Sequence, residues 1–324
     1  MTYPNTRLRR MRYNPIVRDL VSDVNLSVND LIYPVFVCEG VNVKKEIPSM
    51  PGQFQLSIDN LISKCKDVES KGVKAIIIFG VSNAKDSTGD IACNENSIVQ
   101  KAIRRLKKEK IKLLLITDVC NCEYTNHGHC GTVVDGDVEN DLTIKTLVKQ
   151  SVSLVEAGAD IIAPSDMMDG RVKEIRKKLD ELGYYKIPIL AYSAKYASSF
   201  YAPFRDAADS TPTGFDRKTY QMNYCNSNES IREIEQDINE GADMIMIKPA
   251  LSYLDIISKA KSNFNVPVVA YSVSGEYSMI KAAGQNKWIN EEEIMMETIT
   301  SIKRAGADII ITYFALEIAD ILNR

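Results

Sequence analysis

The sequence predicts an α/β fold of the (β/α)8 TIM-barrel type. Three observations support this prediction: eight short apolar runs, helical patterns between most of them, and a junction that is repeated along the chain. A helix end, a glycine and a buried strand follow one another in EAGADIIAPS, EGADMIMIKP and RAGADIIITY. A doubly wound open sheet is the alternative, but YPVFVCEGVN after the first strand holds no glycine-rich dinucleotide motif. The runs begin near Leu31, Val73, Ile111, Asp160, Ile187, Asp243, Val266 and Asp308.

The predicted elements follow from local patterns. The strand runs are apolar on both faces, as expected for a parallel sheet covered by helices. Between Leu142 and Ala157, apolar residues recur at helical spacing and stop at Gly158, a suitable left-handed cap. We expect residues 30–324 to form the barrel, preceded by residues 1–29. Residues 196–221 lack helical periodicity beside a strand end, so we expect an active-site lid there.

Composition limits the possible functions. The chain has 324 residues, 45% of them hydrophobic, and a net charge of −3, which gives no general attraction to nucleic acid or anionic membranes. No apolar run approaches the roughly 20 residues needed to span a bilayer. The start is rich in arginine, but Pro4 and Pro15 interrupt any amphipathic transit helix. An odd number of cysteines, seven, argues against a disulfide scaffold, and we expect a cytoplasmic protein with reduced thiols or metal ligands.

Two lysines close apolar strands, where a charged group is costly. Lys195 ends IPILAYSAK and Lys248 ends ADMIMIKP. Each could be a lysine that reaches solvent at a strand terminus. The fifth and sixth strands are neighbours in a barrel, however, so both amines should open into one mouth and lower each other's pKa. A lysine that is neutral in this way can form Schiff bases with carbonyl substrates.

Other polar residues follow the remaining strands, at the barrel end where active sites lie. They are Asp118, Ser165, Asp166, Ser274 and Tyr313.

A cysteine cluster follows Asp118 in the segment DVCNCEYTNHGHCG. Cys120, Cys122 and Cys130 offer three soft ligands, which favour zinc and leave a fourth tetrahedral position open. The alternative is a chance cluster of thiols without metal. His127 and His129, the only histidines, lie in the same segment and could support the site or merely shape the loop.

These residues make the chain similar to the porphobilinogen synthase (5-aminolevulinate dehydratase) family over nearly its whole length. The most specific segments are DVCNCEYTNHGHCG, APSDMMDGRV, YSAKYASSFYAPFRDAADS, MIMIKPALSYLDI, YSVSGEY and IITYF. The resemblance implies a lyase that condenses two 5-aminolevulinate molecules, with loss of two waters, to porphobilinogen for heme biosynthesis.

The resemblance also implies roles for single residues. Lys248 would form the first Schiff base and Lys195 the second, with Asp118 and Ser165 orienting groups or moving protons. Zn²⁺ on the three cysteines would be catalytic. The substrate-binding residues would be Arg205, Arg217, Gln221, Ser274 and Tyr313, with Phe200 and Tyr201 of the lid excluding water together with Phe204.

An allosteric site is implied at Glu233, in the amphipathic helix ESIREIEQDINEG, where an acidic residue is ordinarily a solvated charge. The resemblance implies that residues 1–29 form an extended N-terminal oligomerisation arm on the catalytic barrel of residues 30–324. Family members with an acid at the Glu233 position bind hydrated Mg²⁺ near a neighbouring subunit's arm, to which Arg12 could belong. We therefore expect Mg²⁺ to favour a homo-octamer and so to raise activity.

Two other functions fit part of the sequence. A lysine-dependent class I aldolase would explain one reactive lysine, but not two beside a thiol cluster. A zinc-stabilised nucleic-acid-binding protein would explain the cysteines and the basic arm, but requires a basic face with aromatic residues, which the sequence lacks.

Overall fold

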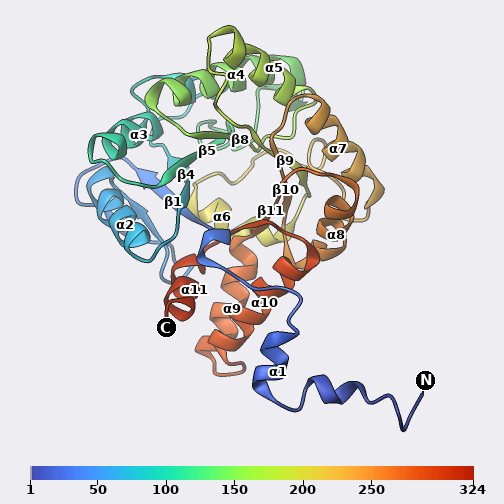
Figure 1. Ribbon diagram of the computed structural model, residues 1–324. Helices are drawn as coiled ribbons and strands as arrows, with labels where there is room; N and C mark the ends of the chain where they lie inside the picture. Colours follow the sequence, from blue (N-terminus) through green and yellow to red (C-terminus); the bar gives the residue numbers. More distant parts are fainter. Residues whose placement is uncertain (1) are drawn as a thin grey trace.

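The computed structural model describes residues 2–324, and its centre is a ring of parallel strands (Figure 1). The hydrogen-bonded order is β8-β5-β4-β1-β12-β11-β10-β9. A parallel bridge between Ile162 and Ile189 joins the two ends of this order and closes the ring. The barrel strands are β1 (Leu31–Cys38), β4 (Ala75–Val81), β5 (Leu114–Val119), β8 (Ile161–Pro164), β9 (Leu190–Lys195), β10 (Met244–Lys248), β11 (Val268–Ser272) and β12 (Ile309–Thr312).

The predicted barrel is therefore confirmed, and the open doubly wound sheet is wrong. All eight predicted runs contain a barrel strand, and β1, β4 and β9 are buried along their whole length. Such strands are apolar on both faces because side chains fill the barrel on one side and helices cover the other.

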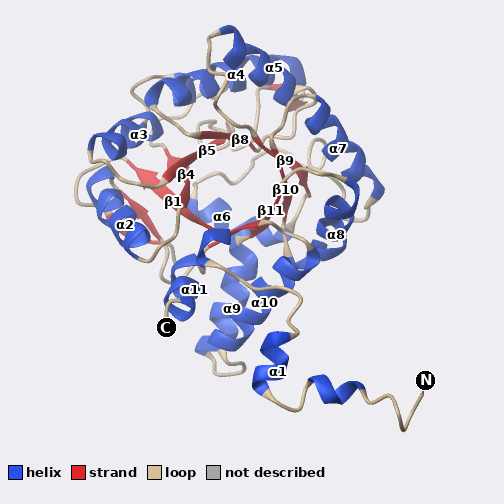
Figure 2. Cartoon of the chain, viewed as in Figure 1, coloured by secondary structure: helices blue, strands red, loops and turns tan. Residues whose placement is uncertain are grey.

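Helices surround the strands (Figure 2). The helix α4 (Asn140–Ala157) matches the predicted one, but begins two residues earlier because the Glu139 side chain accepts a hydrogen bond from the Leu142 N–H at 2.6 Å. Its cap residue Gly158 has a φ of 107°. The other outer helices are α2 (Ile58–Ser70), α3 (Ile98–Lys108), α5 (Arg171–Glu181), α7 (Asn228–Asn239), α8 (Leu254–Asn263), α9 (Ser274–Gln285), α10 (Glu291–Ala305) and α11 (Ala315–Leu322).

Two small hairpins were not predicted from the sequence. β2 (Lys44–Glu46) pairs with β3 (Phe54–Leu56), and β3 also pairs in parallel with the carboxyl end of β1. β6 (Val133–Val134) pairs with β7 (Asp137–Val138). Their strands of two or three residues are too short for an alternating pattern to be visible. Across residues 2–324, every helix is too short or too polar to cross a membrane.

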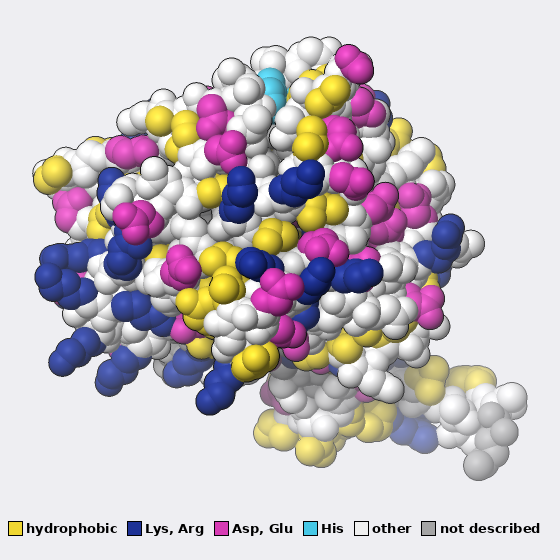
Figure 3. All heavy atoms as spheres, turned by 90° about the horizontal axis from the view of Figure 1, so that it is seen from above, with side chains coloured by type: hydrophobic (Ala, Val, Ile, Leu, Met, Phe, Trp, Pro, Cys, Tyr) yellow, Lys and Arg dark blue, Asp and Glu magenta, His cyan; other side chains and the backbone are white. Residues whose placement is uncertain are grey.

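The N-terminal segment extends away from the barrel (Figures 1 and 3). It contains the short helices η1 (Leu8–Met11), α1 (Pro15–Leu20) and η2 (Val28–Asp30). Large apolar side chains along it are exposed, whereas in a folded monomer such side chains are usually covered. The exposed apolar residues are Tyr3, Leu8, Met11, Tyr13, Ile16, Leu20 and Val21.

The segment 196–221 folds over one end of the barrel and is more regular than predicted. It contains η4 (Ser199–Tyr201) and α6 (Ala202–Ala207), followed by an irregular stretch. The ring of Phe204 packs against Phe36 and Phe79, with centroids 5.7 and 5.0 Å apart. The short helices escaped prediction because their apolar residues contact barrel rings and do not form a helical stripe of their own.

Candidate active site

The two lysines lie side by side at the carboxyl ends of their strands. Lys248 of β10 is paired with Lys195 of β9 in parallel register. Both are buried, at 5% and 4% exposure. They line one cavity, so the predicted shared mouth is present. The other lining residues are Phe79, Asp118, Cys122, Glu123, Ser165, Tyr201, Phe204, Arg205 and Arg217.

The surroundings act differently on the two amines. Burial, and then the charge of Lys195, lower the pKa of Lys248 to about 7. Burial also disfavours the charged form of Lys195, but negative charge on Cys130 and the neighbouring cysteines outweighs it and raises the pKa of Lys195. The predicted mutual lowering is therefore correct for Lys248 and wrong for Lys195, because the negative charge of the cysteine group outweighs burial at Lys195.

Asp118 and Ser165 connect to Lys195 through hydrogen bonds. The Lys195 ammonium donates to the Ser165 carbonyl, and the Ser165 hydroxyl donates to Asp118 Oδ2 at 3.0 Å. Burial raises the pKa of Asp118, against the opposing effect of both lysine charges. This buried carboxyl group can accept or return a proton close to the amines.

The three predicted cysteines form a compact, buried group. Their sulfur atoms lie within 4.8 Å of one another, and Cys120 Sγ is 3.4 Å from Cys122 Sγ. Hydrogen bonds from the Cys120 and Cys122 thiols lower the pKa of Cys130 well below its usual value. All three are free thiols. Three converging sulfur donors, one readily a thiolate, fit a zinc ion with three protein ligands.

Glu123 belongs to the same site and was missed from the sequence. Its carboxyl group is 2% exposed, lies 3.4 Å from Cys122 Sγ and forms a second possible metal-holding group with Asp118 and Cys120. Burial, and then the Asp118 charge, raise its pKa to about 8. A glutamate in a polar loop ordinarily faces solvent. Its position between two of the clustered cysteines, Cys122 and Cys130, was the available signal in the sequence.

The loop that carries the cysteines is bound to the lid. His129 stacks on Phe215 with ring centroids 3.7 Å apart, and its ring nitrogens lie 3.1 Å from the Tyr220 hydroxyl and the Thr213 carbonyl. Arg217 donates to the Gly128 carbonyl at 2.7 Å. The sequence left open whether His129 supports the metal site or shapes the loop. In the structure His129 has a structural role, because it joins the cysteine loop to residues 213–220.

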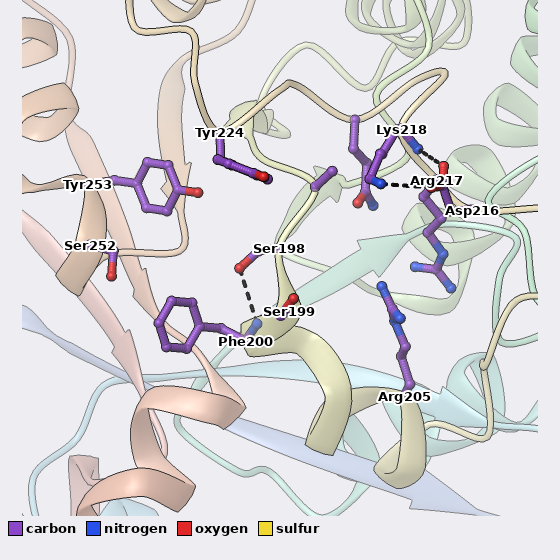
Figure 4. Close-up of a pocket in the computed structure, with 12 residues that line it drawn as sticks. Ser198, Ser199, Phe200, Arg205, Asp216, Arg217, Lys218, Tyr224, Ser252 and Tyr253 are labelled. Atoms are coloured by element: carbon purple, nitrogen blue, oxygen red, sulfur yellow. Dashed lines mark hydrogen bonds and ion pairs between the residues drawn. The ribbon is translucent and has the colours of Figure 1, made fainter.

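Two arginines from the lid meet between the lysine cavity and a larger cavity of about 670 Å³. Figure 4 shows Arg205 and Arg217 pointing toward one another. Burial, and then the Arg217 charge, lower the pKa of Arg205. Gln221 lines the larger cavity, and its buried amide nitrogen and oxygen have no hydrogen-bond partner within residues 2–324. Facing guanidinium groups and an unpaired amide form a suitable site for an anion such as a carboxylate.

The other predicted substrate-binding residues have different positions. Phe200 lines the larger cavity and Tyr201 the lysine cavity. Ser274 and Tyr313 line neither. The Ser274 hydroxyl accepts from the Phe204 N–H at 3.0 Å, and the Tyr313 hydroxyl is 3.0 Å from that of Tyr271. In this structure Ser274 therefore holds the lid, and Tyr313 belongs to a buried tyrosine pair.

Glu233 lies on α7, half-buried and away from the lysines. It lines a cavity with Asn140, Asp169 and Gln236. Burial raises its pKa, against the opposing charge of Arg171. Among residues 2–324, the side-chain groups close enough to hold a metal together do not include Glu233.

The fold and the site define a barrel enzyme with two buried lysines beside a candidate metal centre. A family profile described as delta-aminolevulinic acid dehydratase matches residues 5–321. The chain therefore belongs to the delta-aminolevulinic acid dehydratase family, a family of lyases of porphyrin biosynthesis.

Individual relatives agree with this membership. A Staphylococcus aureus (strain Mu50 / ATCC 700699) protein named delta-aminolevulinic acid dehydratase is 55% identical over 320 residues, 98% of this chain and 99% of its own length. A Methanothermus sociabilis protein of the same name is also 55% identical, covering 99% of both chains. The predicted resemblance is confirmed, and the aldolase and nucleic-acid-binding alternatives are not favoured.

A solved structure shares the fold. It is delta-aminolevulinic acid dehydratase (porphobilinogen synthase) from Toxoplasma gondii ME49, in complex with the reaction product porphobilinogen. Its TM-score to this chain is 0.96, at 45% identity, with 98% of this chain and 91% of that chain covered.

Proposed function

We propose that the protein condenses two molecules of 5-aminolevulinate, with loss of two waters, into porphobilinogen, a step of heme biosynthesis. The observation that carries this proposal is the pair of buried lysines in register on β9 and β10, which line one cavity. Two neighbouring amines can hold two ketone substrates at once, and family membership supports this reaction.

Lys248 is proposed to bind the first substrate. With a pKa of about 7, a large fraction of its amine is neutral at neutral pH and can attack the ketone carbon. The carbonyl oxygen leaves as water, and the resulting iminium acidifies the adjacent carbon. Loss of a proton from a carbon beside a Schiff base gives a carbon nucleophile, which allows the carbon–carbon bond between the two substrates to form.

Lys195 is proposed to form the second Schiff base after losing a proton. Asp118 is the nearby buried carboxylate, linked to the Lys195 ammonium through Ser165. We assign Asp118 the role of accepting and returning this proton, and Ser165 the role of orienting both groups.

The substrate carboxylates require cationic or hydrogen-bonding partners. We assign Arg205, Arg217 and Gln221 to one carboxylate, because their polar groups converge on the larger cavity. Ser274 and Tyr313 are assigned to the other, and would exchange their present contacts with Phe204 and Tyr271 for substrate contacts. Phe200 and Tyr201 would help the lid, residues 196–221, to exclude water.

The three cysteines are proposed to hold zinc, because their converging sulfurs suit its ligand preference. Bound zinc would supply Lewis-acid polarisation of an oxygen ligand beside the Lys195 side of the cavity. Glu123 lies against this group and can hold a proton or a water there.

We also propose a homo-octamer in which the arm, residues 1–29, covers its exposed apolar side chains on another subunit. Mg²⁺ at Glu233 would favour that assembly and raise activity as an allosteric ion. Glu233→Ala should then remove the magnesium response and shift the size distribution in sedimentation analysis. Unchanged size and magnesium response would contradict this assignment.

We place the protein in the cytoplasm. All seven cysteines are free thiols, which suits a reducing compartment.

Reduction with borohydride in the presence of 5-aminolevulinate tests the main proposal. A mass increase that maps to Lys248, together with porphobilinogen formation, is the expected result. A folded protein that forms product without any lysine adduct would overturn the Schiff-base mechanism.

A further inference from the structure

The Lys248 ammonium group is surrounded by aromatic rings. Its Nζ lies 4.6 Å from the ring centroid of Tyr271, 5.0 Å from Phe204, and 5.2 Å from both Tyr192 and Tyr201. All four distances are within the roughly 6 Å over which a ring face attracts a cation. Four rings around one nitrogen resemble the cages that bind alkylated ammonium ligands.

The four rings come from separate parts of the chain. Tyr192 lies on β9 and Tyr271 on β11, both in the barrel wall, whereas Tyr201 and Phe204 belong to η4 and α6 of the lid. The lid is attached at this point, because the Tyr201 hydroxyl donates to the Lys248 carbonyl at 3.0 Å. Half of the ring set is therefore present only while the lid lies over the barrel.

Aromatic rings can stabilise a cationic iminium on Lys248 without favouring protonation of the free amine as strongly as a carboxylate would. A carboxylate beside Lys248 would favour the ammonium form and remove the neutral amine that attacks the ketone. Ring faces attract a cation more weakly and accept no proton. They can therefore stabilise the charge that appears on nitrogen as water leaves, while burial keeps the free amine largely neutral.

Lys195 provides the internal contrast. One ring, Tyr192 at 5.6 Å, lies near its Nζ, and its main partners are the Ser165 carbonyl and the cysteine group. The aromatic environment is thus specific to one of two lysines that are paired in the same register.

We propose that Tyr192, Tyr201, Phe204 and Tyr271 form an aromatic cage that stabilises the cationic iminium on Lys248 and is completed when the lid closes. These residues position and stabilise the charged intermediate through their ring faces. The inference rests on the proposed Schiff base at Lys248, and deepens it by naming the groups that make that iminium favourable.

The test uses levulinate, a keto acid that can form the imine but has no amino group with which to complete the pyrrole. Full-length protein is incubated with levulinate and cyanoborohydride between pH 6 and 9, and the Lys248 adduct is measured by peptide mass spectrometry. Tyr271→Leu should weaken imine formation about tenfold, because one desolvated cation–π contact is lost. Tyr271→Phe retains the ring and should restore most of the adduct.

A second pair of variants examines the lid and protects the test against misfolding. Phe204→Leu should weaken imine formation in the same direction, and Phe204→Tyr should restore it. Circular dichroism and thermal melting identify the variants that fold. If Tyr271→Leu does not fold, the adduct level of Phe204→Leu tests the cage instead.

The outcomes separate the inference from the function beneath it. Folded leucine variants that trap levulinate as well as the wild-type protein would overturn the cage. Equal losses in Tyr271→Phe and Tyr271→Leu would also overturn it, because the hydroxyl bonded to Tyr313 would then matter and the ring would not. A wild-type protein without any Lys248 adduct would overturn the proposed Schiff base at Lys248, whereas the proposed function is judged separately by porphobilinogen formation.

The charged groups that face Lys248 need a separate control. Lys195 lowers its pKa, whereas Asp118, Cys122 and Glu123 oppose that effect. Because neither leucine variant removes a charge, a loss of adduct that persists across the whole pH range supports the rings. A loss of adduct that occurs only at low pH would mean that the neighbouring charges cause the effect, and it would contradict the cage.

Discussion

Lys248 and Lys195 end neighbouring strands in paired register, yet aromatic rings surround the first amine and polar or charged groups surround the second. Four rings lie near Lys248, and its pKa falls to about 7. The cysteine group beside Lys195 raises the pKa of that lysine. The same residue type at the same strand position thus receives opposite tuning from its immediate surroundings.

This difference suggests a division of labour. The amine with the lower pKa is the better first nucleophile, because more of it is neutral before substrate arrives. The other amine carries a proton that must be removed, and Asp118, which accepts a hydrogen bond from Ser165, is the proposed acceptor. The barrel supplies the adjacency of the two amines, and their surroundings supply the order of reaction.

The largest expected effect comes from removing each lysine in turn. Lys248→Ala and Lys195→Ala should each reduce porphobilinogen formation on the order of 10⁴-fold, because each loses a covalent nucleophile. Borohydride trapping should differ, however: Lys195→Ala should still form an adduct on Lys248, whereas Lys248→Ala should trap little substrate. If the first adduct instead forms on Lys195 in both the wild type and Lys248→Ala, the proposed order is reversed.

Loss of the thiol group should affect mainly the Lys195 side, where all three cysteine charges act on the amine. Cys122→Ser combined with Cys130→Ser should lower bound zinc, measured by elemental analysis, and reduce turnover roughly 100-fold, as loss of metal-site groups commonly does. Levulinate trapping on Lys248 should persist. Cys225→Ser, at an exposed thiol, serves as the control. Loss of the Lys248 adduct in the double variant would contradict separate roles for the two regions.

The pH dependence of trapping should reveal the low pKa of Lys248. The neutral amine attacks, so the rate of adduct formation should fall about tenfold per pH unit below pH 7 and level off above it. An unperturbed lysine would continue to gain reactivity up to about pH 10.4. Lys195→Ala should move the midpoint upward, since a neighbouring positive charge is removed. If the trapping rate of the wild type has its midpoint near pH 10, the pKa of Lys248 is not lowered, and the contrast between Lys248 and Lys195 is wrong.

The smallest effect is expected where the cysteine loop holds the lid. Gly128 has a φ of 70°, and an added Cβ would lie 2.4 Å from the Thr211 carbonyl oxygen. Gly128→Ala should separate the two segments and raise KM a few-fold, on the order of 1 kcal/mol of binding, with less effect on kcat. Gly136→Ala is the matched control, because Gly136 also has a positive φ of 84° but open space around it. Equal KM values for the two variants would contradict a role for this contact.

Local patterns in the sequence were sufficient for much of the architecture. Apolar runs located all eight barrel strands, and the helix ending at Gly158 was recognised from its spacing and its cap. The adjacency of Lys195 and Lys248 also followed, because consecutive strands of a barrel are neighbours. Both hairpins and the two short lid helices escaped prediction, since segments of two to six residues carry too little periodicity.

By itself, the sequence determined the barrel, the strand-end positions of the two lysines and the grouping of three thiols within one loop. These features depend on short-range spacing and on a repeating unit, which the order of residues expresses directly. Only the tertiary structure decided that Glu123 is buried, that Ser274 and Tyr313 do not line the lysine cavity, and that the pKa of Lys195 rises while that of Lys248 falls. The physical reason is that burial and electrostatic interaction depend on distances in space, and the groups around each amine come from segments far apart along the chain.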